Sequence, residues 1–123
     1  MATPFTHMLQ SLARQRGVIA ALVVSERDGI VIDSYVQLGH SADRVAALAA
    51  KLFRKARLSA GAAGLGAVSF MQLEAPSGRI CAAGAGDQVI VILAESGINV
   101  GLVRVELLRS AAEIGALDGK GFR

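Results

Sequence analysis

The sequence holds one cysteine, no tryptophan and two histidines among its 123 residues. The lone cysteine, Cys81, excludes an internal disulfide bond. No two of His7, His40 and Cys81 have the sequence spacing of a metal-binding motif. We therefore expect no metal site and no cofactor site. The longest uniformly apolar runs, Val18–Val24 and Val89–Ala94, are far shorter than the roughly 20 residues that cross a bilayer. We therefore expect a cytoplasmic protein that is not an integral membrane protein.

The composition is typical of a folded chain. Hydrophobic residues make up 53% and charged residues 19% of the sequence, whereas disordered chains combine low hydrophobicity with high charge. The length suits one domain. We expect a single domain over residues 1–123, with an ordered core over about residues 4–116 and a glycine-rich flexible tail at residues 118–123.

Hydrophobic periodicity and turn signals predict three helices and five strands. Thr3 as N-cap and Pro4 in the first turn predict a helix that Gly17 ends. The dipeptide Asp28-Gly29 favours a hairpin turn. The strands are expected at Ile30–Val36, Ala67–Glu74 and Arg79–Ala85 and at the two apolar runs Val18–Val24 and Val89–Ala94. The other two helices are expected from Ser41 to about Ala60 and from Val100 to about Ala116.

The two fully apolar runs determine the predicted topology. Val18–Val24 and Val89–Ala94 are apolar at every position, which is typical of strands covered on both faces. Pairing them at the centre, with hairpins elsewhere, gives the strand order 2-1-5-4-3 when the strands are numbered along the chain. We expect an α/β fold of element order α-β-β-α-β-β-β-α. It is a three-layer α/β/α sandwich around a five-stranded, mainly antiparallel sheet.

The helix predicted over residues 41–60 has three distinct faces. An apolar stripe, expected to contact the sheet, comprises Val45, Leu48, Ala49, Leu52 and Ala56. A basic stripe comprises Arg44, Lys51 and Lys55, and a third, mostly small face comprises Ala46, Ala50, Phe53 and Arg57. Between Asp43 and Leu58, five bases stand against one acid, so this segment is more positive than the whole chain, whose net charge is +3.

Several segments in order resemble the Roadblock domain family, which includes the Roadblock-type dynein light chains and many prokaryotic relatives. The matching segments are Gly17–Val24, Asp28–Ile32, Ala46–Ala50, Gly86–Leu93 and Asn99–Arg104. Their order carries the specificity, because no single segment is diagnostic, and the resemblance covers roughly Phe5 to Ala116. Two features depart from the family: Arg16 stands where a proline is common, and the middle helix is unusually basic.

The resemblance implies a non-catalytic homodimer with a Roadblock/profilin-like fold. Roadblock domains usually dimerise through the second helix and the edge of the third strand, and they commonly partner small Ras-like GTPases. The dimer interface implied here comprises Ala46, Ala50, Phe53, Arg57, Val68, Phe70 and Met71. The candidate contacts to a GTPase are Arg44, Lys51 and Lys55. The implied function is regulation or scaffolding of that GTPase, including stimulation of its GTP hydrolysis as in some prokaryotic relatives.

Catalysis by this chain is not expected, and we assign no catalytic residue. The segment Gly61–Gly66 follows a helix and precedes a strand, whereas phosphate-binding loops run from a strand into a helix. The basic stripe leaves two other interpretations open: a solvated helix face, or an electrostatic binder of nucleic acid or an anionic membrane surface. Aromatic residues make up only 4% of the chain, which disfavours stacking on single-stranded nucleic acid. Arginine predominates over lysine, which indicates a GC-rich bacterial genome.

Overall fold

The computed structural model describes residues 3–37, 39 and 41–121, and side chains as far as residue 116. His40 therefore lies outside the described residues. The elements, in chain order, are α1 (Thr6–Ala13), β1 (Val18–Ser25), β2 (Val31–Val36), α2 (Ala42–Ala62), β3 (Phe70–Ala75), β4 (Gly78–Ala85), β5 (Gln88–Ala94) and α3 (Val100–Gly121). Their order is the predicted one.

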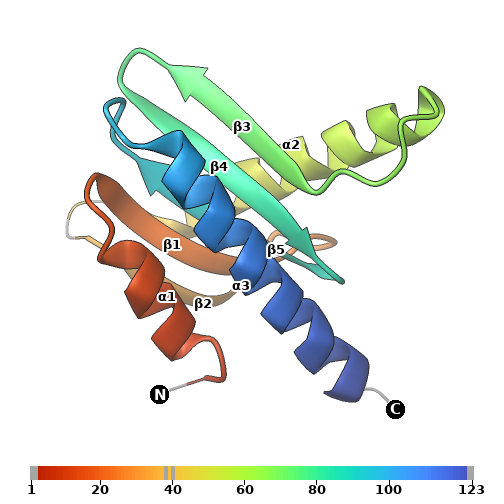
Figure 1. Cartoon of the computed structure of the whole chain (residues 1–123), viewed down its shortest axis with the longest axis horizontal. Coiled ribbons are helices and arrows are strands. Elements are labelled where there is room, and N and C mark those ends of the chain that lie inside the picture. Colours follow the sequence, from red (N-terminus) through yellow and green to blue (C-terminus); the bar gives the residue numbers. More distant parts are fainter. Residues whose placement is uncertain (1–2, 38, 40, 122–123) are drawn as a thin grey trace.

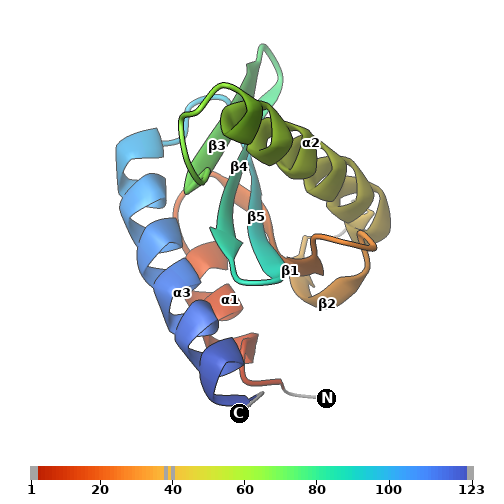
Figure 2. The ribbon, with the colours of Figure 1, turned by 90° about the vertical axis from the view of Figure 1, so that its right-hand side faces the viewer.

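The strands form one antiparallel sheet of order β2-β1-β5-β4-β3, as predicted. β1 and β5 pair at the centre, with Ala21 opposite Ile92. Figure 2 shows α2 on one face of the sheet and α1 with α3 on the other. The predicted three-layer fold is thus confirmed, and it has two separate cores, one beneath α2 and one beneath α1 and α3.

Side chains of β1 and β5 divide between these two cores because successive residues of a strand point to opposite faces. On β1, Leu22 and Val24 face α2, whereas Ala21 and Val23 face α1 and α3. All four have an exposed fraction of 0%. This burial explains why the two central strands are apolar at every position.

Several element boundaries differ from the prediction by a few residues. α1 begins at Thr6, although the hydroxyl of Thr3 accepts a hydrogen bond from the Phe5 N–H at 3.1 Å, as an N-cap would. β3 begins at Phe70 instead of Ala67. The backbone of α3 continues to Gly121, past the predicted end near Ala116, because glycine lowers helix propensity without forbidding a helix. The last two residues of the predicted flexible tail lie outside the described part of the chain.

Asp33 of β2 joins the edge strand to the start of α1. Its carboxylate accepts hydrogen bonds from the hydroxyl groups of Thr3 and Thr6 and from the Ser34 N–H. Partial burial opposes ionisation, but these hydrogen bonds outweigh it and lower the pKa of Asp33 from 3.8. The ionised carboxylate therefore stabilises the folded chain above the unfolded-state pKa, and this contribution is lost as the pH falls through the lower folded-state pKa.

We expect Asp33→Asn to lower the free energy of unfolding at neutral pH by about 1 kcal/mol, because the partly exposed carboxylate accepts charge-assisted hydrogen bonds. The difference from the parent chain should shrink as the pH falls below about 4. Urea unfolding of the parent chain and the variant, at neutral pH and below about pH 4, measures this difference. Asp28→Asn, which removes the same charge at an exposed turn, is the control. An equal loss at both pH values for Asp33→Asn would contradict a role for the ionised carboxylate.

Candidate functional site

The helix α2 contacts the sheet mainly through small residues, on a face that is rotated from the predicted one: Ala49 is buried there as predicted, whereas Leu48 is exposed. Ala46, Ala49, Ala50 and Phe53 all have exposed fractions of 2% or less and pack in the core beneath the helix. Ala46, Ala50 and Phe53 were predicted at a dimer interface, and that assignment is wrong because their own sheet covers them. Small side chains at these positions allow the helix to approach the sheet closely.

Phe53 supplies the bulk that the alanines lack. Its ring lies over Gly84 of β4, where an added Cβ would stand only 3.0 Å from the ring carbon Cζ. A Cβ at position 84 would require the ring to shift by a few tenths of an ångström, so glycine favours the close approach of helix and strand. The packing of Phe53 on Gly84 therefore fits the inward side of α2 that the buried alanines define.

The opposite side of α2 forms what we call the outward face, which combines bases with large apolar side chains. Leu48 and Leu58 are 54% and 56% exposed. The bases of the outward face, all exposed as predicted, are Arg44, Lys51 and Lys55. No acidic residue occurs between Arg44 and Ala62. Figure 1 shows the C-terminal turns of α2 projecting beyond the strands.

The outer edge of β3 pairs with no strand among the described residues. Leu73 on this edge strand is 44% exposed. Of the residues predicted at the interface, Val68 and Met71 are half-buried against the core beneath α2. Phe70 points to the other face of the sheet, where the guanidinium of Arg104 lies 5.6 Å from its ring centroid. The β3 edge is thus bordered by partly exposed apolar side chains.

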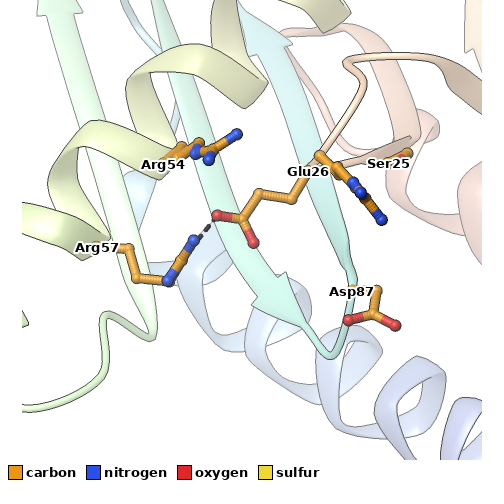
Figure 3. Close-up of a pocket in the computed structure, with 6 residues that line it drawn as sticks. Ser25, Glu26, Arg54, Arg57 and Asp87 are labelled. Carbon is orange, nitrogen blue, oxygen red and sulfur yellow. Dashed lines mark hydrogen bonds and ion pairs between the residues drawn. The ribbon is translucent and has the colours of Figure 1, made fainter.

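Arg57, the remaining predicted interface residue, lies instead at a pocket of about 440 Å³ beside α2 (Figure 3). The pocket is lined by Ser25, Glu26, Arg27, Arg54, Arg57 and Asp87. Arg57 Nε donates to Glu26 Oε1 at 2.7 Å, and the Glu26 side chain is only 15% exposed. In Figure 3, Arg54 and Arg57 extend from α2 on one side, and Asp87 lies across from them on the β4–β5 turn.

Two turns meet at this pocket because β1 and β5 are antiparallel neighbours. Ser25 at the end of β1 is opposite Gln88 at the start of β5. The Glu26 N–H donates to the Asp87 carbonyl at 3.1 Å, which ties the β1–β2 turn to the β4–β5 turn. Gly29 and Gly86, with φ of 68° and 66°, allow these tight reversals. The pocket walls are therefore held by backbone hydrogen bonds.

The bases of α2 are exposed as predicted, whereas Leu48, predicted to contact the sheet, is exposed, and neither the exposed Leu58 nor the pocket was predicted. Two weak signals were available: Phe53 is the single aromatic residue of α2, and Leu48 and Leu58 fall at helical spacing among the bases. The other lining residues come from separate turns, and no local motif joins them.

No cluster of three or more potential metal ligands occurs among residues 3–37, 39 and 41–116. Cys81 is buried in β4, and burial raises the pKa of its thiol, although Arg79 partly offsets the shift. A buried, protonated thiol is unreactive. Within the described part of the chain, no helix is both long and apolar enough to span a membrane.

Comparisons with known proteins agree with this architecture. The Roadblock/LC7 domain model matches residues 5–94. The uncharacterized protein MJ1340 of Methanocaldococcus jannaschii is 30% identical over 110 residues, which cover 89% of this chain and 96% of that protein. The Roadblock/LC7 domain from Streptomyces avermitilis has a TM-score of 0.79 at 24% identity, covering 90% of this chain and 94% of that one. Gliding protein MglB from Thermus thermophilus has a TM-score of 0.81 at 16% identity, covering 98% of this chain and 94% of that one. The chain therefore belongs to the Roadblock/LC7 domain family.

Proposed function

We propose that this chain is a non-catalytic homodimer that regulates or scaffolds a small Ras-like GTPase. The observation that carries the proposal is the outward face of α2, where exposed leucines stand among bases without an intervening acid. Such a face suits a protein partner that is partly apolar and partly acidic. Family membership adds support, because Roadblock domains commonly partner small GTPases.

Dimerisation is supported by two exposed apolar features. The unpaired edge of β3 contains neither Pro nor Lys from Phe70 to Ala75, and such unguarded edges readily pair with another strand. Leu52 and Ala56 of α2 are half-buried beside the exposed Leu48 at helical spacing. These three residues replace the buried alanines as the helix contacts that we propose between two chains. Pairing β3 with its copy would extend one sheet across the dimer.

The bases of the outward face are suited to recognise an acidic partner surface. Arg44, Lys51 and Lys55 are exposed, and none forms an ion pair with another described residue. Charges at the rim of an interface accelerate encounter more than they strengthen the final complex. We therefore assign these bases to steering, and the leucines beside them to contact after docking.

Reversing Lys51 and Lys55 to Glu should slow association with the GTPase about tenfold at low salt, and change the dissociation rate much less. Added salt should shrink the difference. Stopped-flow kinetics with the small GTPase encoded nearest to this gene, loaded with GDP or a GTP analogue, provides the measurement. Reversal of Arg14 and Arg16, which are exposed outside α2, is the charge-matched control.

An unchanged association rate would rule out the outward face of α2 as the GTPase contact. The next surface to test would then be α3, where Leu102 and Val105 are 52% and 60% exposed.

The same bases support an alternative function, electrostatic binding of nucleic acid or an anionic membrane surface. The favouring observation is the absence of any acid on α2 after Asp43. The buried position of Phe53, the aromatic residue of this helix, removes it from any stacking on bases. Binding to duplex DNA that falls steeply with salt would favour the alternative, and no binding to duplex DNA or to anionic vesicles at low salt would rule it out.

A further inference from the structure

We propose that the pocket formed by Arg27, Arg54 and Arg57 binds a phosphoryl group. It lies between α2 and the two turns at one end of the sheet, beside the outward face and distinct from it. Its volume of about 440 Å³ is more than sufficient for such a group. The inference goes beyond the GTPase proposal and does not depend on it.

The pocket holds two guanidinium groups without partners. Arg57 is neutralised by Glu26 through the 2.7 Å ion pair. Arg27 and Arg54 form no ion pair or side-chain hydrogen bond with any described residue. Like charges gathered around one cavity repel each other, and an anion that binds between them relieves that repulsion.

The number of donors favours phosphate over a carboxylate. Each guanidinium presents a planar fork of N–H donors that matches an oxyanion in a bidentate manner. Two free guanidinium groups and the hydroxyl of Ser25, which also lines the pocket, offer many hydrogen-bond donors. The two oxygens of a carboxylate are too few to accept from all of these donors. A phosphoryl group brings three oxygens and close to two negative charges, and can therefore satisfy both arginines.

The pocket is preorganised on three sides. The Glu26–Arg57 pair connects α2 to the β1–β2 turn, and the hydrogen bond from the Glu26 N–H to the Asp87 carbonyl connects the two turns. Arg54 lies one helical turn before Arg57 on the same side of α2. The carboxylate of Asp87, across the pocket from Arg54, lowers the positive potential at the site (Figure 3). We therefore expect Arg54 to strengthen the binding of an anion and Asp87 to weaken it.

The test is an NMR titration of the full chain with inorganic phosphate at constant ionic strength and about pH 8, where phosphate carries close to two charges. Saturable shifts are expected at the amides of Ser25, Glu26 and Arg27. Arg54→Ala should weaken binding about fivefold, whereas Asp87→Asn should tighten it about twofold. Neither change is expected to unfold the chain, because Arg54 and Asp87 are exposed and alanine is a strong helix former.

Arg16→Ala is the matched control, because Arg16 is an exposed arginine at the opposite end of β1. Its phosphate affinity should equal that of the parent chain. Equal weakening by Arg16→Ala and Arg54→Ala, or shifts that follow exposed bases over the whole surface, would overturn the proposal. Titration with O-phosphoserine separates the two sources of the group: tighter binding than inorganic phosphate indicates a phosphorylated side chain, and weaker binding indicates the free ion.

Discussion

Ala50→Glu is expected to abolish most of the folded state. Ala50 is 2% exposed and packs in the core between α2 and the sheet. A carboxylate there would be buried without a partner, which costs several kcal/mol. A domain of this size has a free energy of unfolding of about 5–15 kcal/mol, so the loss is a large share of its stability. Far-UV circular dichroism during urea unfolding measures the change.

Ala47→Glu is the matched control for this experiment. Ala47 is on the same helix but exposed, and a surface change of this kind shifts stability by only about 0.5 kcal/mol. If both variants retained the stability of the parent chain, the observed orientation of α2 would be contradicted. Loss of a dimer with full retention of the fold in Ala50→Glu would support the orientation that the sequence pattern predicted.

Leu73→Lys is expected to convert the proposed dimer into a folded monomer. Leu73 lies on β3, whose outer edge pairs with no strand among the described residues, and is 44% exposed in the single chain, so the substitution leaves the core of the chain intact. A lysine on an edge strand opposes pairing with another strand, because its charge would be desolvated at the junction. Sedimentation of the parent and variant at about micromolar concentration distinguishes the two states.

The opposite edge of the sheet provides the control. Ile30, next to the edge strand β2, is 62% exposed, and Ile30→Lys should leave the mass in solution unchanged. A parent chain that sediments as a monomer would contradict the dimer itself. Dissociation by Ile30→Lys but not by Leu73→Lys would place the interface at β2 instead of β3.

The sheet could be predicted from the sequence because burial leaves a strong local signature. A strand covered on both faces must be apolar at every position, and β1 and β5 are apolar over almost their whole length. Two such strands in a five-stranded sheet with hairpin connections leave few possible orders. The turns at Asp28-Gly29 and Gly86-Asp87 then set the directions of the strands.

The orientation of α2 could not be predicted from hydrophobicity alone. Leu48, Leu52 and Val45 form the more hydrophobic stripe, and such a stripe usually faces the core. Here close packing favours alanine on the inner side, and Phe53 fills the space above Gly84. Leu48 and Leu58 are left outside, where burial would require another chain. A helix that also has large apolar residues on its outer side therefore misleads an argument from periodicity.

The pocket lined by Arg27, Arg54 and Arg57 could not be predicted from the sequence either. Glu26, Arg57 and Asp87 are far apart in the sequence and meet only because antiparallel pairing brings two turns beneath α2. The charge pattern of α2 indicated an excess of bases, but it did not indicate which of these bases line the pocket. That distinction depends on the path of the helix across the sheet, which no local pattern encodes.

The central pairing of β1 with β5 has a consequence for how the chain folds. Ala21 and Ile92 are neighbours in the sheet but lie far apart in the sequence. Closing so long a loop costs chain entropy before any contact between these strands compensates for it. The hairpins of β1 with β2 and of β4 with β5, and the helix α2, can form locally, and we expect the step that joins the two halves to be slower. Until then both apolar strands would lack their covering, so we expect aggregation to compete most strongly at this stage of folding.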